Sequence, residues 1–203
     1  MGGRDLAVAG VLLAAGNASR FGGEKLLRPL PGGVPLGIAA AANLGRALQK
    51  QVAVVRQGDG TLTARLRTLG FEVVVNPGAH MGMGSSIAVG VGAARQAAGW
   101  IIALADMPWI NPATIRKVGS RLEAGASVVA PMYQGKRGHP GGFANKWGDQ
   151  LLGLSGDKGA RGLVAAAGDE VELFETEDPG VLLDVDVPED IPRTGRQCLR
   201  HGA

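Results

Sequence analysis

The residues best suited to chemistry follow an apolar run near the N-terminus. Residues 6–13 are nearly all apolar, and the Ala-Ala-Gly turn at residues 14–16 follows with very small side chains. A strand that leads into such a turn presents successive backbone N–H groups, which form a concave site for anions. Arg20 and Lys25 then supply two full positive charges. The stretch therefore predicts a phosphate-binding loop.

Two familiar glycine-rich motifs do not account for this loop. The G-x-x-x-x-G-K-[ST] motif needs a hydroxyl residue after its lysine, whereas Leu26 follows Lys25. The G-x-G-x-x-G motif needs three glycines, and only Gly16 lies in the turn. The loop is thus neither a Walker loop nor a dinucleotide fingerprint. An ordinary polar loop with two solvated cations stays open as the alternative.

A carboxylate ends another apolar run. Residues 100–106 read WIIALAD, and a Met-Pro pair then turns the chain away. Ligands of open α/β sheets collect beyond the carboxyl ends of the strands, so Asp106 is predicted to face the phosphate loop. Mg²⁺ commonly takes one or two protein carboxylates together with phosphates and water, and Asp106 is a predicted ligand. The alternative is a cap for the helix that begins near Pro112, for which Asn111 is better placed.

A second acidic stretch, LLDVDVPED, occupies residues 182–190. Asp184 and Asp186 lie two residues apart and share one face of the expected strand. Two acids on one face repel each other unless a cation or donors compensate, which favours a second metal contact here. Asp186, nearer the end of the strand, is the predicted ligand. The alternative is that Asp184 or Asp186 caps a terminal helical turn.

Three glycine-containing loops supply further candidates. Residues 76–86, NPGAHMGMGSS, open a helix, and Gly82 and Gly84 would permit backbone contact with a flat base. An ordinary capped helix start is the alternative. The stretches KRGHPGGF (136–143) and GDKGAR (156–161) carry donors and cations that suit a phosphate and a polar ring system, unless Asp157 only caps a helix and the cations are only solvated. The candidates here are Arg137, His139, Asp157, Lys158 and Arg161.

Short valine-rich runs alternate with stretches of helical spacing. Strands are expected at residues 6–13, 52–55, 73–75, 101–105, 128–130 and 181–185. Helices are expected at 35–48, 61–69, 85–97 and 112–122, and an interrupted one at 146–167. The loop at 136–143 is expected to lead into another strand. This alternation predicts a doubly wound α/β fold in three layers, with a mostly parallel sheet.

Length and charge bound the function. The 203 residues suffice for one core, so we expect a single domain over 1–192 and a flexible C-terminal tail over 193–203. The net charge is +3, but the basic residues are scattered and aromatic residues are few, which argues against nucleic-acid binding. The N-terminus lacks the layout of a signal peptide and no apolar run approaches about 18 residues. We therefore expect a cytoplasmic protein without a membrane partner.

The motifs together resemble the MobA-like nucleotidyltransferases. Residues 13–25 are similar to the signature L-x-A-G-x-S-x-R-x-G-x-x-K, although Asn17-Ala18-Ser19 departs from the usual pattern after the glycine. The A-D-M-P turn, the D-x-D-x-P-E-D ending and the M-G-x-G-S-S, R-G-H-P and G-D-x-G-A-R segments also look like motifs of this family. The resemblance extends over about residues 6–190 and is strongest to the molybdenum cofactor cytidylyltransferases. It implies a Rossmann-like nucleotidyltransferase fold.

The resemblance also implies a reaction. A nucleotidyl group would pass from CTP to molybdopterin with Mg²⁺ as cofactor and pyrophosphate as product. Arg20 and Lys25 would hold the triphosphate, Asp106 the metal, and the M-G-x-G-S-S segment the nucleoside, while the R-G-H-P and G-D-x-G-A-R segments would border the second substrate. The family also places a metal or nucleotide contact at the D-x-D-x-P-E-D ending, and the resemblance leaves open whether Asp184 or Asp186 makes it. The implied nucleotide contacts are Leu13, Ala14, Ala15, Gly16, Arg20, Lys25, Asn76, Gly82, Gly84, Ser85 and Asp106.

Other functions remain open at this point. A guanylyltransferase of the same cofactor would use GTP, but its relatives carry two glycines in the first motif where this chain has Ala15 before Gly16. A transferase acting on a sugar or alcohol phosphate is the next alternative. A nucleotide-binding module without turnover is disfavoured, because binding alone does not need the carboxylates at the ends of the two expected strands to hold a metal between phosphates. A molybdoenzyme or its maturation chaperone would be a further partner.

Overall fold

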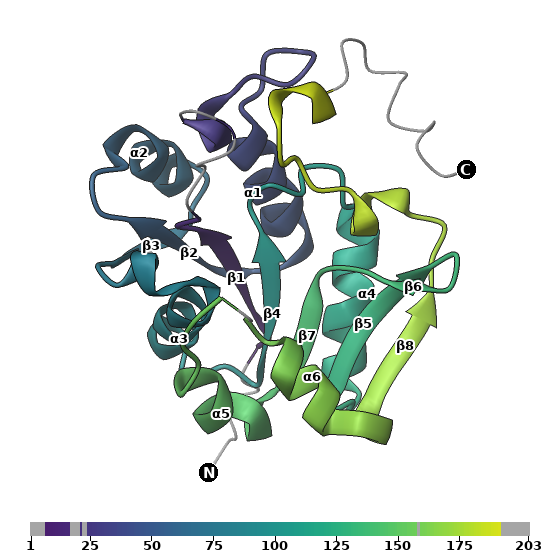
Figure 1. Ribbon diagram of the computed structural model, residues 1–203. Coiled ribbons are helices and arrows are strands. Elements are labelled where there is room, and N and C mark those ends of the chain that lie inside the picture. The colour runs from purple at the N-terminus through teal and green to yellow at the C-terminus, as the bar shows by residue number, and fades with distance from the viewer. Residues whose placement is uncertain (1–6, 17–20, 22–23, 158, 192–203) are drawn as a thin grey trace.

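The computed structural model describes residues 7–16, 21, 24–157 and 159–191 of the chain (Figure 1). Its centre is an eight-stranded sheet in the order β3-β2-β1-β4-β7-β5-β6, with β8 pairing with β5. The strands are β1 (Ala9–Ala14), β2 (Lys50–Arg56), β3 (Glu72–Asn76), β4 (Gly99–Leu104), β5 (Val128–Tyr133), β6 (Lys136–Arg137), β7 (Gly141–Ala144) and β8 (Val171–Glu175).

The sheet is mixed and mostly parallel. Strand β1 pairs in parallel with β2 and β4, β2 with β3, and β5 with β8. Only the short β6 and β7 run antiparallel to their neighbours. The predicted doubly wound α/β fold with a mostly parallel sheet is therefore confirmed.

The order of the strands reverses at β1. The chain passes outward from β1 to β2 and β3 and then returns to place β4 on the other side of β1. Connections that leave neighbouring strands in opposite directions open a crevice at the carboxyl ends of those strands. Here the crevice lies between the residues that follow β1 and those that follow β4.

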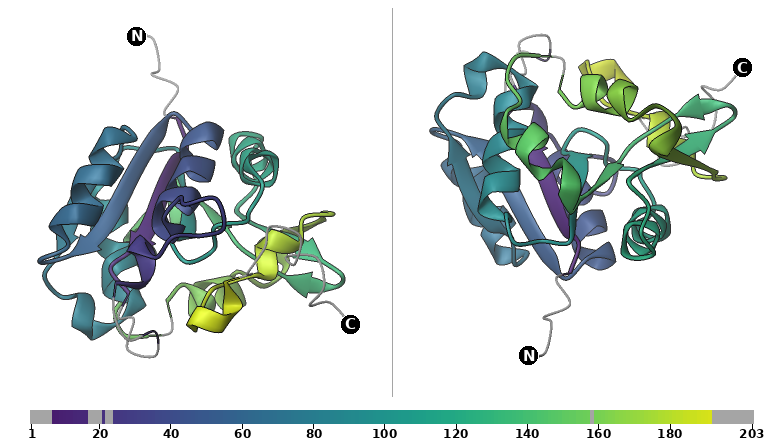
Figure 2. Two further views of the ribbon diagram at one scale, coloured as in Figure 1. Left: turned by 90° about the horizontal axis from the view of Figure 1, so that it is seen from above. Right: turned by 90° about the horizontal axis from the view of Figure 1, so that it is seen from below.

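Helices cover both faces of the sheet, which makes three layers (Figure 2). One face carries α1 (Leu36–Ala47), α2 (Gly60–Thr68) and α4 (Pro112–Glu123). The other carries α3 (Met83–Ala93), α5 (Gly148–Leu152) and α6 (Arg161–Ala167). Short 3₁₀ turns complete the chain: η1 (Lys25–Leu27), η2 (Ala79–Met81), η3 (Asn145–Trp147), η4 (Gly168–Glu170), η5 (Pro179–Leu182) and η6 (Pro188–Asp190).

Burial on both faces of the sheet explains the continuous apolar runs. All six residues of β1 are buried, and Leu12 packs into the layer under α1 and α4 while Leu13 packs into the layer under α3. A strand covered on both faces cannot alternate apolar with polar side chains, so it appears as an unbroken run. The first five strands lie where these runs predicted them, and β7 follows the loop at 136–143 as expected.

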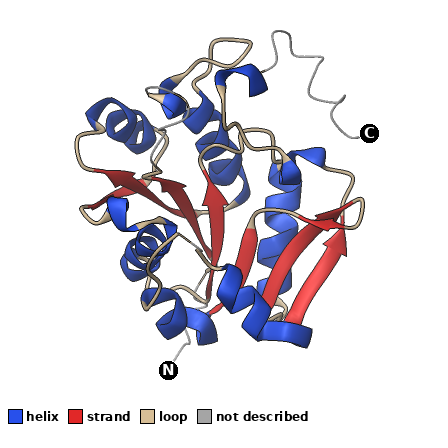
Figure 3. Ribbon diagram, in the orientation of Figure 1, coloured by secondary structure: helices blue, strands red, loops and turns tan. Residues whose placement is uncertain are grey.

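The expected strand at residues 181–185 is wrong. Residues 179–182 form the 3₁₀ turn η5, and the chain from Leu183 to η6 is loop (Figure 3). Val181 and Val185 are fully buried although neither takes part in a ladder of the described sheet. The Val185 N–H donates to the carbonyl of Asp106 at 3.0 Å, and the His139 N–H donates to the carbonyl of Val181 at 2.9 Å. Burial of alternate valines therefore arises here without strand pairing.

The last parallel strand is β8, which the sequence pattern did not reveal. Its five residues, VELFE, include two glutamates, and only Phe174 is fully buried. Lys117 and Arg121 from α4 lie over the ring of Phe174, at 4.6 and 5.0 Å from its centroid. An edge strand with one covered residue carries a weak apolar signal.

The described helices include none with the length and apolarity that a bilayer crossing requires. The sheet joins strands from residue 9 to residue 175 in one unit. The single domain over 1–192 stays a prediction, and the predicted tail at 193–203 lies outside the described residues.

Candidate active site

A cavity of about 580 Å³ opens at the carboxyl ends of β1, β2 and β4. Its walls come from the loop after β1, the β2–α2 loop, the turn η2 and the residues after β4, together with one residue each from the loops at 157 and 186. Several predicted site residues lie in its lining: Leu13, Ala14, Ala15, Gly16, Lys25, Gly82, Asp106, Asp157 and Asp186.

The floor of the cavity is the end of β1. Ala14 and Ala15 are buried, and the chain becomes exposed at Gly16. A Cβ placed on Gly16 would have no heavy atom of the described residues within 4 Å, so packing against those residues does not require glycine here. A glycine at the end of a strand lets a ligand approach the backbone closely.

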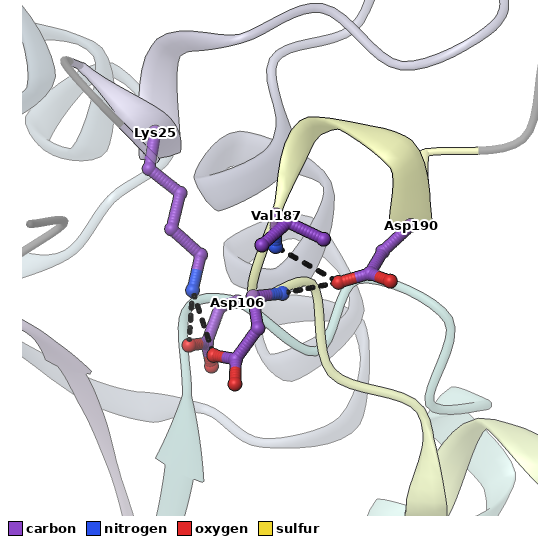
Figure 4. A network of polar contacts seen from close by, with 5 residues as sticks. Lys25, Asp106, Val187 and Asp190 are labelled. Carbon is purple, nitrogen blue, oxygen red and sulfur yellow. Dashed lines mark hydrogen bonds and ion pairs between the residues drawn. The ribbon is translucent and has the colours of Figure 1, made fainter. Parts of the chain in front are cut away.

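Lys25 lies at the centre of the polar groups. It begins η1, and its side chain is only 11% exposed. Its Nζ donates to Oδ2 of Asp106 at 2.8 Å and lies 3.8 Å from Oδ1 of Asp186 (Figure 4). Two carboxylates from chain segments 80 residues apart thus converge on one cation.

Asp106 is held by the sheet. It follows β4, which is laddered to β1 on one side and to β7 on the other. The backbone continues the contact with β1, because the Ala105 N–H donates to the carbonyl of Leu13 at 3.1 Å. The neighbouring Asn111 caps α4 through a bond from the Ala113 N–H, as the sequence suggested, so Asp106 is not used as that cap.

Of the two acids in the C-terminal stretch, Asp186 approaches Lys25. Its side chain is 48% exposed at the edge of the cavity. Asp184 is exposed and lies within the electrostatic range of His139 instead. The prediction of Asp186 as the metal ligand is therefore compatible with the geometry and remains a prediction.

The donor set suits a hard divalent cation. Among the described residues, no cluster of three or more His, Cys, Asp or Glu side chains is arranged to hold a metal on its own. Two carboxylates that share a lysine ammonium already lie around one point of positive charge. Mg²⁺ and similar ions bind in this way when substrate phosphates and waters supply the remaining ligands.

The far end of the cavity carries an ion pair that sequence reasoning missed. Arg56 ends β2, and its Nε donates to both carboxylate oxygens of Asp59, at 3.0 and 3.1 Å. Both residues line the cavity with Gly58 and Gly60. A charged residue directly after a parallel strand, followed by a glycine-rich turn, was the available signal.

The predicted nucleoside segment is used largely for packing. Asn76 is buried, and its amide donates to the hydroxyls of Ser85 and Ser86 at 3.0 Å each, while Oδ1 accepts from the Gly78 N–H. The Ser85 hydroxyl donates to the carbonyls of Gly78 and Gly82. Neither Asn76 nor Ser85 lines the cavity, whereas Ser86 does. Nucleotide contacts by Asn76 and Ser85 stay predictions that this geometry does not favour.

The two glycines of this segment admit a neighbouring loop. A Cβ on Gly84 would lie 2.7 Å from the Ser155 carbonyl oxygen, and the Gly84 N–H donates to the Gly156 carbonyl at 2.8 Å. Gly82 has a φ of +99°, and a Cβ there would lie 2.4 Å from Oδ1 of Asp157. Close approach of the 155–157 loop explains both glycines, so a contact with a base is not needed to account for them.

Arg137 and Arg161, two of the predicted second-substrate residues, lie within electrostatic range of a third, His139. Asp106 also lies within this range of His139. His139 is accessible to solvent, yet enough protein surrounds it that desolvation lowers its pKa below the usual value. The charges of Arg137 and Arg161 lower the pKa further, whereas Asp106 and Asp184 oppose the shift. These residues therefore share one electrostatic neighbourhood on the acidic side of the cavity. Asp157 lines the cavity itself, and Arg20 and Lys158 lie outside the described residues.

A family model described as "MobA-like NTP transferase domain" matches residues 10–171, most of the chain and all the strands up to the first residue of β8. The chain belongs to this family. It is accordingly an enzyme of the nucleotidyltransferase class, in a family that acts on nucleoside triphosphates. The crevice after β1 and β4, with its lysine and two carboxylates, is the corresponding candidate active site.

Proteins with different names are similar to this chain in sequence or in structure. The nicotine blue oxidoreductase of Paenarthrobacter nicotinovorans is 32% identical, with 95% of this chain and 99% of that protein covered. A nucleotidyl transferase from Methanothermobacter thermautotrophicus is 25% identical, with a TM-score of 0.74, covering 91% and 94% of the two chains. Rv0371c of Mycobacterium tuberculosis, in a complex with manganese, is 26% identical, with a TM-score of 0.76 and coverage of 91% and 95%. A divalent cation in a relative of this fold is consistent with a metal-dependent enzyme.

Proposed function

We propose that the chain transfers a cytidylyl group from CTP to the phosphate of molybdopterin, with Mg²⁺ as cofactor and pyrophosphate as product. The observation that carries the proposal is the convergence of Asp106 and Asp186 on Lys25, at the mouth of an open backbone turn. A cation and two carboxylates beside an anion cradle suit phosphoryl chemistry, which depends mainly on positioning and on charge stabilisation.

The proposed reaction needs no covalent intermediate. A terminal phosphate oxygen of the acceptor forms a bond to the α-phosphorus of CTP, and the bond from that phosphorus to the oxygen of the leaving pyrophosphate breaks. The backbone of residues 14–16 holds the triphosphate, and Lys25 offsets the negative charge that grows on the phosphate oxygens. Arg20 is proposed to assist Lys25.

Asp106 and Asp186 would hold Mg²⁺ in this reaction. The ion would neutralise phosphate charge and orient the phosphate oxygens. Lys25 contacts these carboxylates in the structure, so its ammonium occupies the place of positive charge between them. With a metal present, the ammonium would be available to the phosphates.

The cavity has room for a nucleoside on the side of β2. Neighbouring strands lie about 4.8 Å apart, so the end of β2 is about two strand spacings, roughly 10 Å, from Asp106 after β4. Arg56 and Asp59 line the cavity at the end of β2 and present both donors and acceptors. Ala15 lines the cavity where the guanylyl relatives place a glycine, and its methyl group is proposed to favour a pyrimidine over a purine. CTP is therefore the proposed nucleotide.

The acceptor would bind on the opposite side of Asp106. Arg137, His139 and Arg161 supply cationic and neutral donors there. His139 is held neutral at pH 7 by its lowered pKa, so it can donate from one ring nitrogen and accept at the other. A polar ring system with a phosphate, such as molybdopterin, matches this mixture. The proposed partner that receives the product is a molybdoenzyme or its maturation chaperone, and the proposed location is the cytoplasm.

The test is pyrophosphate release from CTP and from GTP, each with molybdopterin and Mg²⁺. We expect a kcat/KM for CTP that exceeds the value for GTP, and an Ala15→Gly variant in which the ratio moves toward one without a change in the Mg²⁺ dependence. Equal or reversed efficiencies in the wild type would identify a guanylyltransferase. Release only with a sugar or alcohol phosphate would assign another acceptor, and the absence of release with any acceptor would contradict the proposal.

A further inference from the structure

Asp190 is a polar residue that neither the cavity nor the proposed reaction uses. It is the last residue of η6, and its Oδ2 accepts two backbone N–H bonds, from Asp186 at 2.7 Å and from Val187 at 2.9 Å (Figure 4). Pro188 begins the turn, and an acid at the third position that reaches back to the N-cap N–H is one half of a capping box. The side chain of Asp190 thus closes a hydrogen-bonded ring with the backbone of Asp186 and Val187.

This ring matters because Asp186 has no strand to support it. The chain from Leu183 to Val187 is irregular and makes no ladder in the described part of the sheet. The preceding residue, Val185, is buried and bonded to the Asp106 carbonyl, which fixes the chain on the N-terminal side of Asp186. On the C-terminal side, the carboxylate of Asp190 binds the backbone of Asp186 itself.

We propose that Asp190 is a positioning residue for Asp186. By accepting the N–H groups of Asp186 and Val187, it sets the direction in which the Asp186 carboxylate leaves the backbone, toward Lys25 and Asp106. Bonds from N–H groups to a carboxylate are stronger than those to a neutral acceptor, which suits a single side chain that must hold an exposed turn. The inference rests on the metal role of Asp186 under the proposed function.

Two different effects of Asp190 can be separated. Its hydrogen bonds depend on an acceptor oxygen, which Asn retains and Ala removes. Its negative charge would attract a cation to the cavity from any nearby position, and the adjacent exposed acid Glu189 supplies the same charge. Glu189→Ala is therefore the matched control for charge, and Asp190→Asn is the conservative rescue.

The experiment measures Mn²⁺ binding to the full chain with CTP present, by the loss of the EPR signal of the free ion beyond the loss that CTP alone causes, because the phosphates supply part of the metal ligands. Residues that orient metal ligands typically change metal affinity by about 10-fold to 100-fold when they are removed. We expect Asp190→Ala to weaken Mn²⁺ binding by about 10-fold, Asp186→Asn to weaken it at least as much, and Asp190→Asn and Glu189→Ala to change it by no more than about 3-fold. Circular dichroism establishes that each variant is folded.

Hydrogen exchange at the amides of Asp186 and Val187 supplies a readout that needs no metal. We expect protection in the wild type and in Asp190→Asn, and faster exchange in Asp190→Ala. If exchange quickens in Asp190→Ala but Mn²⁺ affinity does not change, while Asp186→Asn loses affinity, the positioning role is wrong and the metal assignment stands. Equal losses in Asp190→Ala and Glu189→Ala would also overturn it, because charge alone would then suffice. If Asp186→Asn keeps full affinity, the metal role of Asp186 fails, and this inference fails with it.

Discussion

Asp106 and Asp186 reach the same lysine from two very different supports. Asp106 extends from a central strand with partners on both sides, and its backbone is tied to β1 by a bond one residue before it. Asp186 lies in a loop that is held by side-chain carboxylates bonding to backbone N–H groups, at Asp178 before it and at Asp190 after it. One acid is placed by the sheet and the other by local polar contacts.

This difference in support indicates which of the two aspartates can change its position. A strand in the middle of a sheet opens only when much of the fold opens. The loop around Asp186 has no ladder bonds, and beyond the buried Val185 it is held by exposed hydrogen bonds to Asp190, so this part of it opens at lower cost. The side chains show the same order, because Asp106 is 29% exposed and Asp186 is 48% exposed. We therefore expect Asp106 to define the position of the metal and Asp186 to close around it.

The strongest test of this comparison is Asp106→Asn. The amide keeps the shape and a weak oxygen ligand but loses the charge, so we expect Mg²⁺-dependent turnover to fall by about 100-fold or more with the fold intact. Steady-state kinetics across a range of Mg²⁺ concentrations and a thermal melt measure the two effects. A variant that stays active at low Mg²⁺, or that melts at a much lower temperature, would show that Asp106 is structural.

Lys25→Ala removes the charge that both acids share. We expect kcat to fall by roughly 10-fold to 100-fold and KM for CTP to rise by less, because negative charge on the phosphates grows toward the transition state. The comparison of kcat with KM is the measurement. A raised KM with an unchanged kcat would indicate that Lys25 only binds the nucleotide.

Asp178→Ala tests the supports of the loop. The Asp178 carboxylate accepts bonds from the Asn111 N–H, the Thr114 hydroxyl and the Gly180 N–H, which joins the start of η5 to α4. Removing these bonds leaves the hydroxyl of the buried Thr114 without this acceptor, and we expect the free energy of unfolding to fall by about 2 kcal/mol. For a chain of this size the melting temperature would drop by about 4–8 °C. The neighbouring Glu177→Ala is the control. An equal effect of both variants would show that the three bonds of Asp178 do not anchor the start of η5 to α4.

The pKa of His139 gives the smallest and most local test. Because its pKa is lowered on folding, the unfolded chain binds more protons than the folded chain at pH values between the two pKa values. Stability therefore decreases as the pH falls through about 6.5, levels off below the lowered pKa of the folded state, and does not depend on this group well above pH 7. We expect His139→Gln to flatten this decrease. In NMR titrations, Asp106→Asn and Asp184→Asn should each lower the pKa of His139 further, because both carboxylates favour the protonated form. A pKa that does not move in Asp184→Asn would show that this acid points elsewhere.

Features that depend on neighbouring residues could be predicted from the sequence. The apolar run of β1, the small residues after it and the acid after β4 are each contiguous in the chain, and burial on both faces makes such strands easy to recognise. The family resemblance and the doubly wound fold follow from those stretches and are confirmed. The phosphate loop and the metal role of Asp106 are predicted for the same reason, and both stay predictions.

Only the tertiary structure decided how distant segments meet. The valines at 181–185 have the pattern of a strand, but they pack on the loop after β4, and this places Asp186 beside Lys25 and leaves Asp184 near His139. Gly82 and Gly84 have the pattern of a ligand loop, yet the loop at 155–157 fills the space above them. A pattern records that a residue is buried or has no side chain, and the partner that buries it comes from elsewhere in the chain. For that reason the composition of the site was predictable, whereas the choice between its two C-terminal acids needed the folded chain.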